Sequence, residues 1–534
     1  MTHGDRDINE STVLCLGVAA LLGLALALVI YPPAFLMGDA ARFYNFVFPN
    51  DALNYRLAWR ALVDHGDPWP SLWTDLFNHP RGFPISLMDG LPLAATLFRP
   101  FVSWLPAEFH YFGLWHAVVV TLQSVAGAVF VRAAGVRHVV PCLAGSLLAL
   151  AMPIFVGRIN WAHVALSTQG SLILALALCV YASRERPSLA FLFPRAAGLS
   201  LVTLSIHPLL DLQVLLFSLL AVALSDSSML RRGGAALALC LLFAALCQAL
   251  GIFAADSFAS PLPVGEFGFS PLGMIVGEPD ALRELYAARG PGVEHDAWLG
   301  AGCVFLLLVG LLLRPRLRIP RACYPMAGAV ALLAIIAITP WVRIGTWMFD
   351  FSFLFPAAVL DLYSIHRNAV RLAWPLVTCL SLLAMVHLAT AWPRSRAIAA
   401  LVVAFALQIY SAWPYWAYEY RDARAAMERL APPPGILDGG TRLVVIEDDG
   451  VPSGATSRYA MHLAVETGIP LEGGWFSRPP PGSTDRKDQA DSGDRGARYL
   501  AAAAHRIELP ERLPGVSDPV ACVRWEWLIV CRAE

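Results

Sequence analysis

The 534-residue sequence contains little charge and almost no lysine. Charged residues make up 15% of the chain, the formal net charge is -1, and Lys487 is the single lysine. Proteins that bind DNA or RNA carry clustered basic residues, whereas the arginines here are dispersed along the chain. We therefore expect no nucleic-acid partner.

Several motifs of common chemistries are also missing. The sequence has no phosphate-binding G-x-x-x-x-G-K-[ST], no G-x-G-x-x-G after a strand, no H-E-x-x-H and no C-x-x-C. Glu294, His295 and Asp296 are residue types that bind metals, but they lack the i, i+4 spacing of a helical metal site. We expect neither a cofactor nor a metal.

Ten cysteines are present, and eight of them lie in apolar runs, where a free thiol packs as a small hydrophobic group. The other two, Cys522 and Cys531, lie in a polar tail. They are spaced to bridge a short hairpin if the tail faces an oxidising compartment, although spacing alone does not define the pairing.

What the sequence has in abundance is apolar residues. They make up 57% of the chain, and the mean hydropathy is +0.58, which is typical of a membrane protein. Membrane-length runs predict a mainly α, polytopic protein with about eleven transmembrane helices. These runs begin near residues 12, 110, 139, 162, 196, 211, 233, 297, 322, 371 and 397.

Arginines predict how these helices are oriented. The first run has acidic flanking residues and no cleavage site after it, so we expect an uncleaved anchor. Arginines are concentrated in every second connection between the apolar runs, and arginine-rich connections usually face the cytoplasm. This distribution predicts a cytoplasmic N-terminus and an extracytoplasmic C-terminus. This orientation requires that residues 91–106, which contain three prolines and Arg99, form an interfacial or re-entrant helix rather than a span. Three large loops then share the outer face: 33–109, 256–296 and 341–370.

The composition changes at about residue 417, where charged residues become frequent. We predict a transmembrane domain over residues 1–416 and a small soluble α/β domain over 417–534. Within that domain the pattern predicts a buried strand at 441–448, a helix ended by Gly468 and an alternating strand at the C-terminus.

Acids and arginines of the outer loops are the candidate chemical groups. Asp39, Asp51 and Asp89 lie in the first loop, where partial desolvation can tune a carboxylate to act as a general base. Outer-loop acids can equally be solvated or paired with arginine, and Asp51 can simply cap a helix. Guanidinium groups match phosphate oxygens, and the arginines of interest are Arg56, Arg60, Arg99, Arg367 and Arg371.

Ionisable residues within the apolar runs are few. His207 and Asp211 lie in the sequence SIHPLLDLQ, and His163 lies at the edge of a predicted span. A buried intramembrane acid is a candidate functional residue. The same stretch also fits the end of one span and the start of the next, and both interpretations stay open.

The stretch from Asp51 to Pro70, followed by HPRGFPISLMDGLPLAATLFRP and FHYFGLWHAVV, resembles the GT-C superfamily of membrane glycosyltransferases. These proteins similarly have an acid in the loop after the first span, a tyrosine one turn later and Pro-rich interfacial helices. More closely, the chain resembles an uncharacterised bacterial membrane family of this type, through the spacing of Asp51 to Trp59 and of Asp89 to Leu93. GEFGFSPLGMIVGE, EHDAWLGAG and SIHRNAVRLAWP continue the likeness over roughly residues 12–415.

This resemblance implies an inverting hexosyl or pentosyl transfer from a polyprenyl-phosphate donor to a lipid or glycan acceptor, at the outer face of a bacterial inner membrane. It implies Asp51 as the base, Asp89 as a second or positioning acid, and Asp39 as the alternative base nearer the first span. It also implies Arg56, Arg99, Arg367 and Arg371 for binding the phosphate. Further candidates for substrate binding are Tyr55, Trp59, Arg60, His163, Glu294 and His295.

Two other functions remain open. A transporter or flippase of a lipid-linked saccharide would need polar residues along a path through the membrane, and His207 and Asp211 are the candidates. A non-catalytic envelope scaffold would keep the shell of a GT-C protein without a working site.

Overall fold

The structure is a computed structural model, and its described residues group into two compact units. We name the first, formed by residues 1–32, 115–246 and 259–418, the membrane unit. We name the second, formed by 33–114, 247–258 and 419–534, the loop-tail unit. The described residues are 3–38, 51–88, 90–107, 109–160, 163–255, 269–276, 297–312, 324–338, 340–344, 347–365, 369–416, 437, 440, 442–445, 453–472, 497–502, 520–525 and 528–533.

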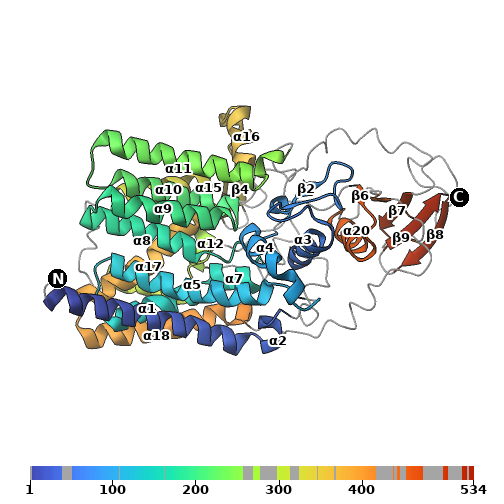
Figure 1. The fold of residues 1–534 in the computed structure, drawn as a ribbon. Coiled ribbons are helices and arrows are strands. Elements are labelled where there is room, and N and C mark those ends of the chain that lie inside the picture. The colour runs from blue at the N-terminus through green and yellow to red at the C-terminus, as the bar shows by residue number, and fades with distance from the viewer. Residues whose placement is uncertain are drawn as a thin grey trace. The chain divides into compact units, whose positions relative to one another are not determined.

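The membrane unit is built from helices that follow the apolar runs of the sequence (Figure 1). Its longer helices are α1 (His3–Ile30), α5 (Phe112–Ala133), α6 (Val139–Leu150), α8 (Gly170–Glu185), α9 (Leu189–Leu204), α10 (Pro208–Ala223), α11 (Met229–Ala249), α14 (Ala301–Leu312), α15 (Tyr324–Ile338), α17 (Trp374–Ala391) and α18 (Arg394–Trp416). Shorter elements are α7 (Pro153–Asn160), α12 (Pro271–Val276), α16 (Ala357–Ile365), the 3-10 helices η7 (Ser352–Leu354) and η8 (Ala369–Ala373), and a hairpin of β3 (Trp341–Ile344) and β4 (Trp347–Asp350).

Among the described residues, five helices are long and apolar enough to cross a membrane, so the chain is a multi-pass membrane protein. They are Thr12–Ile30, Phe112–Ala133, Met229–Ala249, Ala369–Ala391 and Arg394–Ala412. All five coincide with runs predicted from the sequence. Helices α6 and α7 pass the same test together, with a bend of 48° between them, and count as a sixth span when taken as one broken helix. The total of eleven spans stays a prediction.

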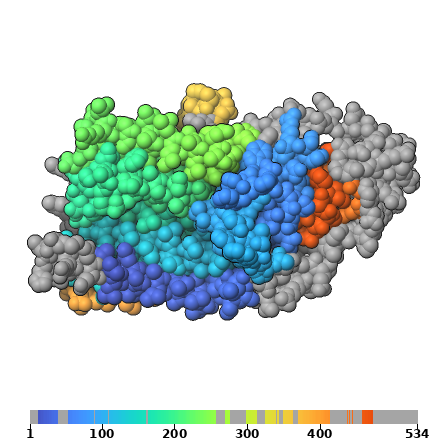
Figure 2. Space-filling model, in the orientation of Figure 1, coloured from blue at the N-terminus to red at the C-terminus, as the bar shows by residue number. Residues whose placement is uncertain are grey.

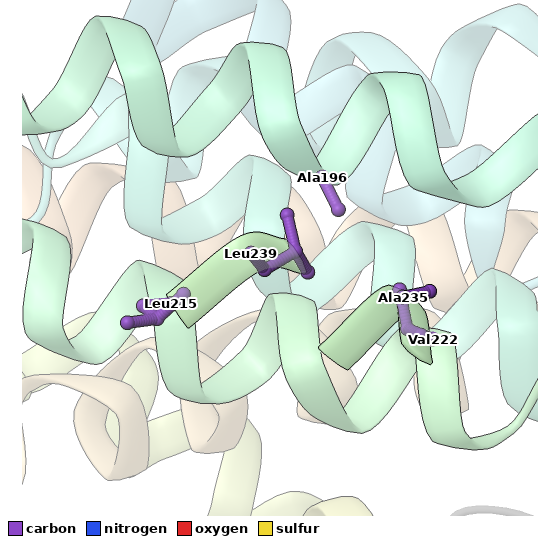
Figure 3. Close-up of a cluster of buried hydrophobic side chains, with 5 residues drawn as sticks. All are labelled: Ala196, Leu215, Val222, Ala235 and Leu239. Atoms are coloured by element: carbon purple, nitrogen blue, oxygen red, sulfur yellow. The ribbon is translucent and has the colours of Figure 1, made fainter. Parts of the chain in front are cut away.

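Small residues let the helices of this unit approach closely. Ala196 on α9, Leu215 and Val222 on α10, and Ala235 and Leu239 on α11 form one buried apolar cluster (Figure 3). In the space-filling view these helices form a continuous green surface (Figure 2). At Gly302 of α14, an added Cβ would lie 2.0 Å from the carbonyl oxygen of Ala404 on α18. This contact therefore requires glycine.

The loop-tail unit combines short elements from the first loop and from the tail. The loop contributes α2 (Pro33–Leu36), α3 (Asp51–His65), β1 (Trp73–Thr74), β2 (Phe83–Pro84), η3 (Ile85–Leu87), α4 (Pro92–Phe98) and η4 (Arg99–Trp104), and residues 247–258 add η5 (Ile252–Ala254). Residues 91–106, predicted not to cross the membrane, form α4 and η4. A seven-residue helix rises only about 10 Å, which is too short for a span.

The tail supplies a mixed five-stranded sheet in the order β6-β5-β7-β9-β8. Its elements are β5 (Arg442–Val445), α20 (Ser453–Thr467), β6 (Leu471–Glu472), β7 (Ala497–Ala502), β8 (Val520–Trp525) and β9 (Leu528–Ala533). Strands β6 and β7 run parallel to β5, and α20 forms the crossover between β5 and β6. Gly468 ends α20 with φ of +70°, as the sequence predicts, because glycine adopts left-handed backbone without strain.

The C-terminal strand is predicted as one continuous strand, and this is wrong. Two antiparallel strands, β8 and β9, form there instead, and their register places Cys522 opposite Cys531. Cys531 is disulfide-bonded. The alternating pattern suits either arrangement, and pairing with β7 makes β9 an inner strand. The predicted boundary at residue 416 between two separate domains stays a prediction.

Candidate functional site

Helix α3 carries the residues from which the sequence resemblance starts. Asp51 is its first residue, and Asn54, Tyr55, Arg56 and Trp59 on the following turns are all at most 3% exposed. A helix buried on several sides must find hydrogen-bond partners for its polar side chains. Those partners determine what each predicted site residue can do.

Tyr55 and Trp59 pack into an aromatic cluster formed with residues 109–112. The indole nitrogen of Trp59 donates to the carbonyl oxygen of Phe109 at 2.9 Å, and its ring meets Tyr111 edge-on at 5.3 Å between centroids. The ring of Tyr55 meets Phe112 edge-on at 5.9 Å. This cluster fixes α3 against the segment that leads into α5.

His110 adds a second connection between these two segments. Its Nδ1 accepts from the backbone N–H of Phe112 at 3.0 Å, and its Nε2 lies 3.1 Å from the carbonyl oxygen of Tyr55. Because Nδ1 accepts, Nε2 must carry the proton and donate to that carbonyl. His110 is therefore a neutral structural residue that fixes the backbone of α3 at Tyr55.

Tyr111 reaches the backbone beside a predicted acid. Its hydroxyl donates to the carbonyl oxygen of Gly90 at 2.6 Å, and burial raises the pKa of the Tyr111 phenol above its usual value. The phenol therefore stays protonated and keeps donating. This bond fixes the chain directly after Asp89, which itself lies outside the described residues.

Arg56 and Arg60, predicted to share a helical face, have different partners. Arg56 is 3% exposed, and its Nη2 lies 3.7 Å from Oε1 of Glu466 on α20. Arg60 is more exposed, donates to Asp64 at 2.8 Å and reaches the carbonyl oxygen of Ala107 at 3.3 Å. Of the two, Arg60 has the guanidinium that a solvent-borne phosphate can approach.

The guanidinium of Arg99 makes hydrogen bonds with the backbone of its own loop. It donates to the carbonyl oxygen of Ser71 at 2.6 Å and also to that of Asp67. Burial lowers the pKa of Arg99, and the Asp67 carboxylate opposes this effect. An arginine remains protonated at any physiological pH, so Arg99 holds a fixed positive charge at the start of η4.

The membrane unit contains its own polar group. Arg158 of α7 is fully buried, contacts Nδ1 of His163 and lies over the ring of Trp374, with 5.7 Å from Cζ to the ring centroid. The carbonyl oxygen of Arg371 accepts from Nε2 of Gln213 at 3.2 Å. Two predicted residues, His163 and Arg371, therefore belong to polar contacts of this unit.

Asp211 is fully buried in the first turn of α10, beside the Ser200 hydroxyl of α9. His207 is the N-cap of α10, and its Nδ1 accepts from the backbone N–H of Leu210 at 3.4 Å. The sequence left two interpretations open for this stretch. Helix α9 ends at Leu204 and α10 begins at Pro208, so this stretch connects two helices. The same arrangement places Asp211 in a buried position among the helices.

Several predicted residues lie outside the described part of the chain, and these are Asp39, Asp89, Glu294, His295 and Arg367. For Asp51 only the backbone position is described. No group of three or more metal-binding side chains occurs among the described residues. The assignment of these acids and of Arg367 stays a prediction.

Sequence reasoning missed Arg158, Gln213 and a row of polar residues on α20. Arg458, His462 and Glu466 follow each other at intervals of four along α20, so they share one face. That spacing was a usable signal for a polar contact with another element. The intervals alone did not reveal α3 as the partner.

The helices define this chain as a multi-pass membrane protein. A family model described as a domain of unknown function, DUF6311, matches residues 20–413, so the chain belongs to this family. The predicted membership of an uncharacterised membrane family is confirmed. No curated protein matches the chain.

Two solved structures are similar to the chain. One is the arabinofuranosyltransferase AftD from Mycobacteria, with 14% identity and a TM-score of 0.46, and the match covers 98% of this chain and 40% of that one. The other is the archaeal oligosaccharyltransferase AglB from Archaeoglobus fulgidus, in complex with an inhibitory peptide and a dolichol-phosphate. It has 13% identity and a TM-score of 0.36, over 92% of this chain and 69% of that one.

Proposed function

We propose that the protein is a GT-C-type membrane glycosyltransferase. It transfers a sugar from a polyprenyl-phosphate donor to a lipid or glycan acceptor at the outer face of a bacterial inner membrane. The observation that carries this proposal is the placement of the resembling motif: Asp51 begins a helix whose Tyr55 and Trp59 are fixed by contacts with residues 109–112. Packing thus fixes the position of the helix that carries the proposed catalytic acid.

The proposed reaction is a single displacement. The Asp51 carboxylate accepts the proton of an acceptor hydroxyl while the oxygen of that hydroxyl attacks the anomeric carbon of the sugar. The bond from this carbon to the phosphate oxygen breaks, and the configuration at the carbon is inverted. The polyprenyl phosphate leaves with the bond electrons, and arginine side chains neutralise its charge. A helix N-terminus favours an ionised carboxylate, which is the form a base needs.

Five arginines are candidates for binding the phosphate. Arg60 and Arg99 are partly exposed. Arg367 and Arg371 are proposed from the resemblance. Arg56 is buried and already pairs with Glu466. Asp89 is proposed as a second acid and Asp39 as the alternative base. Glu294, His295 and His163 complete the proposed substrate-binding set.

The proposed orientation has a cytoplasmic N-terminus and an extracytoplasmic C-terminus. The distribution of arginines supports it. The disulfide at Cys531 also supports it, because disulfides persist in oxidising compartments outside the cytoplasm.

The test is mass spectrometry of lipid-linked saccharides and envelope glycans from cells that lack the protein. These cells are complemented with the wild type, with Asp51→Asn, or with Asp75→Asn as a control acid that is exposed in the same loop. We expect the wild type and the control to restore a missing glycan and Asp51→Asn to fail at equal membrane levels. Restoration by Asp51→Asn would move the base to Asp39 or Asp89. No glycan change in the deletion strain would remove the transferase proposal and favour a scaffold.

A transporter of a lipid-linked saccharide is the second candidate function. It is supported by Arg158 and Asp211, which are charged or ionisable residues fully buried within the membrane unit. A transporter would make Asp211→Asn lose function and Asp51→Asn retain it, with undelivered lipid-linked saccharide accumulating. The same complementation experiment therefore separates the two candidates.

A further inference from the structure

We propose that Glu466 in the tail positions α3, and with it Asp51, by holding Arg56. The tail then serves the transferase site as its scaffold. This inference rests on the proposed function, because it assigns the tail a role in presenting the catalytic acid. Three groups of contacts within the loop-tail unit support it.

The first group joins α20 to α3 through charged and polar side chains. Glu466 Oε1 lies 3.7 Å from Nη2 of Arg56 and 3.9 Å from Nδ1 of His462. One turn from Asp51, the Asn54 Oδ1 accepts from Nε of Arg458 at 3.3 Å. The face of α20 that carries residues 458, 462 and 466 is therefore directed at α3.

The burial of Arg56 makes this contact consequential. Its guanidinium is almost fully removed from water, while the Glu466 side chain remains 35% exposed. A buried cation is tolerated when a carboxylate and hydrogen-bond acceptors compensate its lost hydration. Reversing the charge at Glu466 places two cations together and drives the two helices apart.

The second group joins the first loop to the edge of the tail sheet. Leu471 of β6 donates its backbone N–H to the carbonyl oxygen of Leu76 at 2.8 Å, and its own carbonyl oxygen accepts from His79 at 3.1 Å. Phe77 and Leu471 form a parallel bridge. Because β6 is the edge strand of the sheet, the bridge at Phe77 attaches the first loop to that edge.

The third contact lies at the C-terminal end of α3. An added Cβ at Gly468 would come within 3.2 Å of Cε1 of His65, the last residue of the helix. Contacts with the tail therefore extend from Asn54 to His65. An isolated helix of 15 residues is marginal in water, so the position of α3 depends on its neighbours, and the tail is one of them.

The experiment uses the full-length protein with Glu466→Arg, Arg56→Glu, the double exchange of both residues, and the conservative Glu466→Asp. Arg184 and Glu185 provide a matched control, because they are also 3.7 Å apart but are exposed by 34% and 51%. Two quantities are measured: hydrogen–deuterium exchange of peptides covering residues 51–65 in purified protein, and glycan product per amount of folded protein in complemented cells.

We expect each single reversal to raise exchange in residues 51–65 at least tenfold and to lower product per folded protein by a similar factor. The double exchange should restore slow exchange in residues 51–65, Glu466→Asp should restore both slow exchange and product, and Glu185→Arg should change neither. Product that falls only in proportion to the folded protein would overturn the proposal, because Glu466 would then act on folding alone. Unchanged exchange in α3 would also overturn it.

These outcomes are distinguishable from failure of the proposed function. If Asp51→Asn retains full product, the transferase assignment of Asp51 fails and the link to catalysis fails with it, whatever the exchange data show. If Asp51→Asn abolishes product but the Glu466 reversal does not lower it, the transferase proposal stands and the positioning role is wrong.

Discussion

The two units of this molecule satisfy their polar side chains in different ways. In the membrane unit, several serine and threonine hydroxyls donate to a carbonyl oxygen one turn earlier, as Ser146 does to Cys142 and Ser381 to Val377. In the loop-tail unit, polar side chains reach distant parts of the chain. Trp59 bonds to a residue 50 positions away, Ser86 to one 164 away and Arg458 to one 404 away.

This difference teaches how each unit is specified. A helix in an apolar environment satisfies its own backbone and its small polar side chains locally, so hydropathy is enough to recognise it. The loop-tail unit has short elements that are stable only in contact with one another. Its shape is therefore decided by contacts between segments that are far apart in the sequence.

The largest loss of stability is expected at the close contact between helices α14 and α18 of the membrane unit. Gly302→Ala places a methyl group 2.0 Å from the Ala404 carbonyl oxygen, and overpacking of this kind costs about 1–3 kcal/mol or more. We expect loss of most folded protein, measured by size-exclusion chromatography of detergent extracts. Gly198→Ala on α9 is the control, since nothing lies within 4 Å of an added Cβ there. Equal losses for both variants would contradict close helix contact as the basis of this unit.

Trp59→Phe tests the long-range bonding of the loop-tail unit. It keeps an aromatic ring but leaves the Phe109 carbonyl oxygen without its 2.9 Å donor, at a cost of about 1–3 kcal/mol. We expect faster proteolytic cleavage in the first loop at unchanged thermal stability of the membrane unit. Trp104→Phe, at a site 81% exposed, serves as the control. A uniform loss across both units would show that the units do not unfold separately.

Gln408 sharpens the comparison because, like Gln213, it makes long-range bonds inside the membrane unit. Its amide donates to the carbonyl oxygens of Ala151 at 3.1 Å and Leu299 at 3.0 Å, and accepts from the backbone of Cys303 at 3.1 Å. Gln408→Leu removes these bonds and should lower stability by about 1–3 kcal/mol, seen as a lower Tm in detergent. A Tm equal to that of the wild type would mean that hydropathy alone holds this unit together.

The smallest effect on stability is expected at an exposed apolar patch of the loop-tail unit. Trp69, Leu97, Phe101, Val102 and Trp104 are all exposed, and residues 91–106 are predicted to form an interfacial or re-entrant helix. Tryptophan is favoured at that depth. Trp104→Ser should therefore change stability by less than about 0.5 kcal/mol but weaken quenching of tryptophan fluorescence by brominated lipids. Quenching equal to that of the wild type would contradict membrane contact at Trp104.

The elements that the sequence predicted correctly have local signals. The five spans, the helix that ends at Gly468 and the strand at 442–445 follow from hydropathy, glycine punctuation and strand-forming residues. The last strand was predicted wrongly because an alternating run does not say whether it is continuous or folded back on itself. Cys522 and Cys531 were the better signal, since they oppose each other across that hairpin.

The candidate site was predictable only in part, for the same physical reason. The sequence alone determined that this is a multi-pass membrane protein whose first loop carries Asp51, Tyr55, Arg56 and Trp59 at helical spacing, because periodicity and hydropathy depend on near neighbours. Only the tertiary structure decided that Arg56 faces Glu466, that Trp59 faces Phe109 and that Leu471 continues the loop into the tail sheet. These contacts depend on which groups from distant parts of the sequence can pair with a buried charge or hydrogen-bond donor. A local sequence pattern contains no information about such partners.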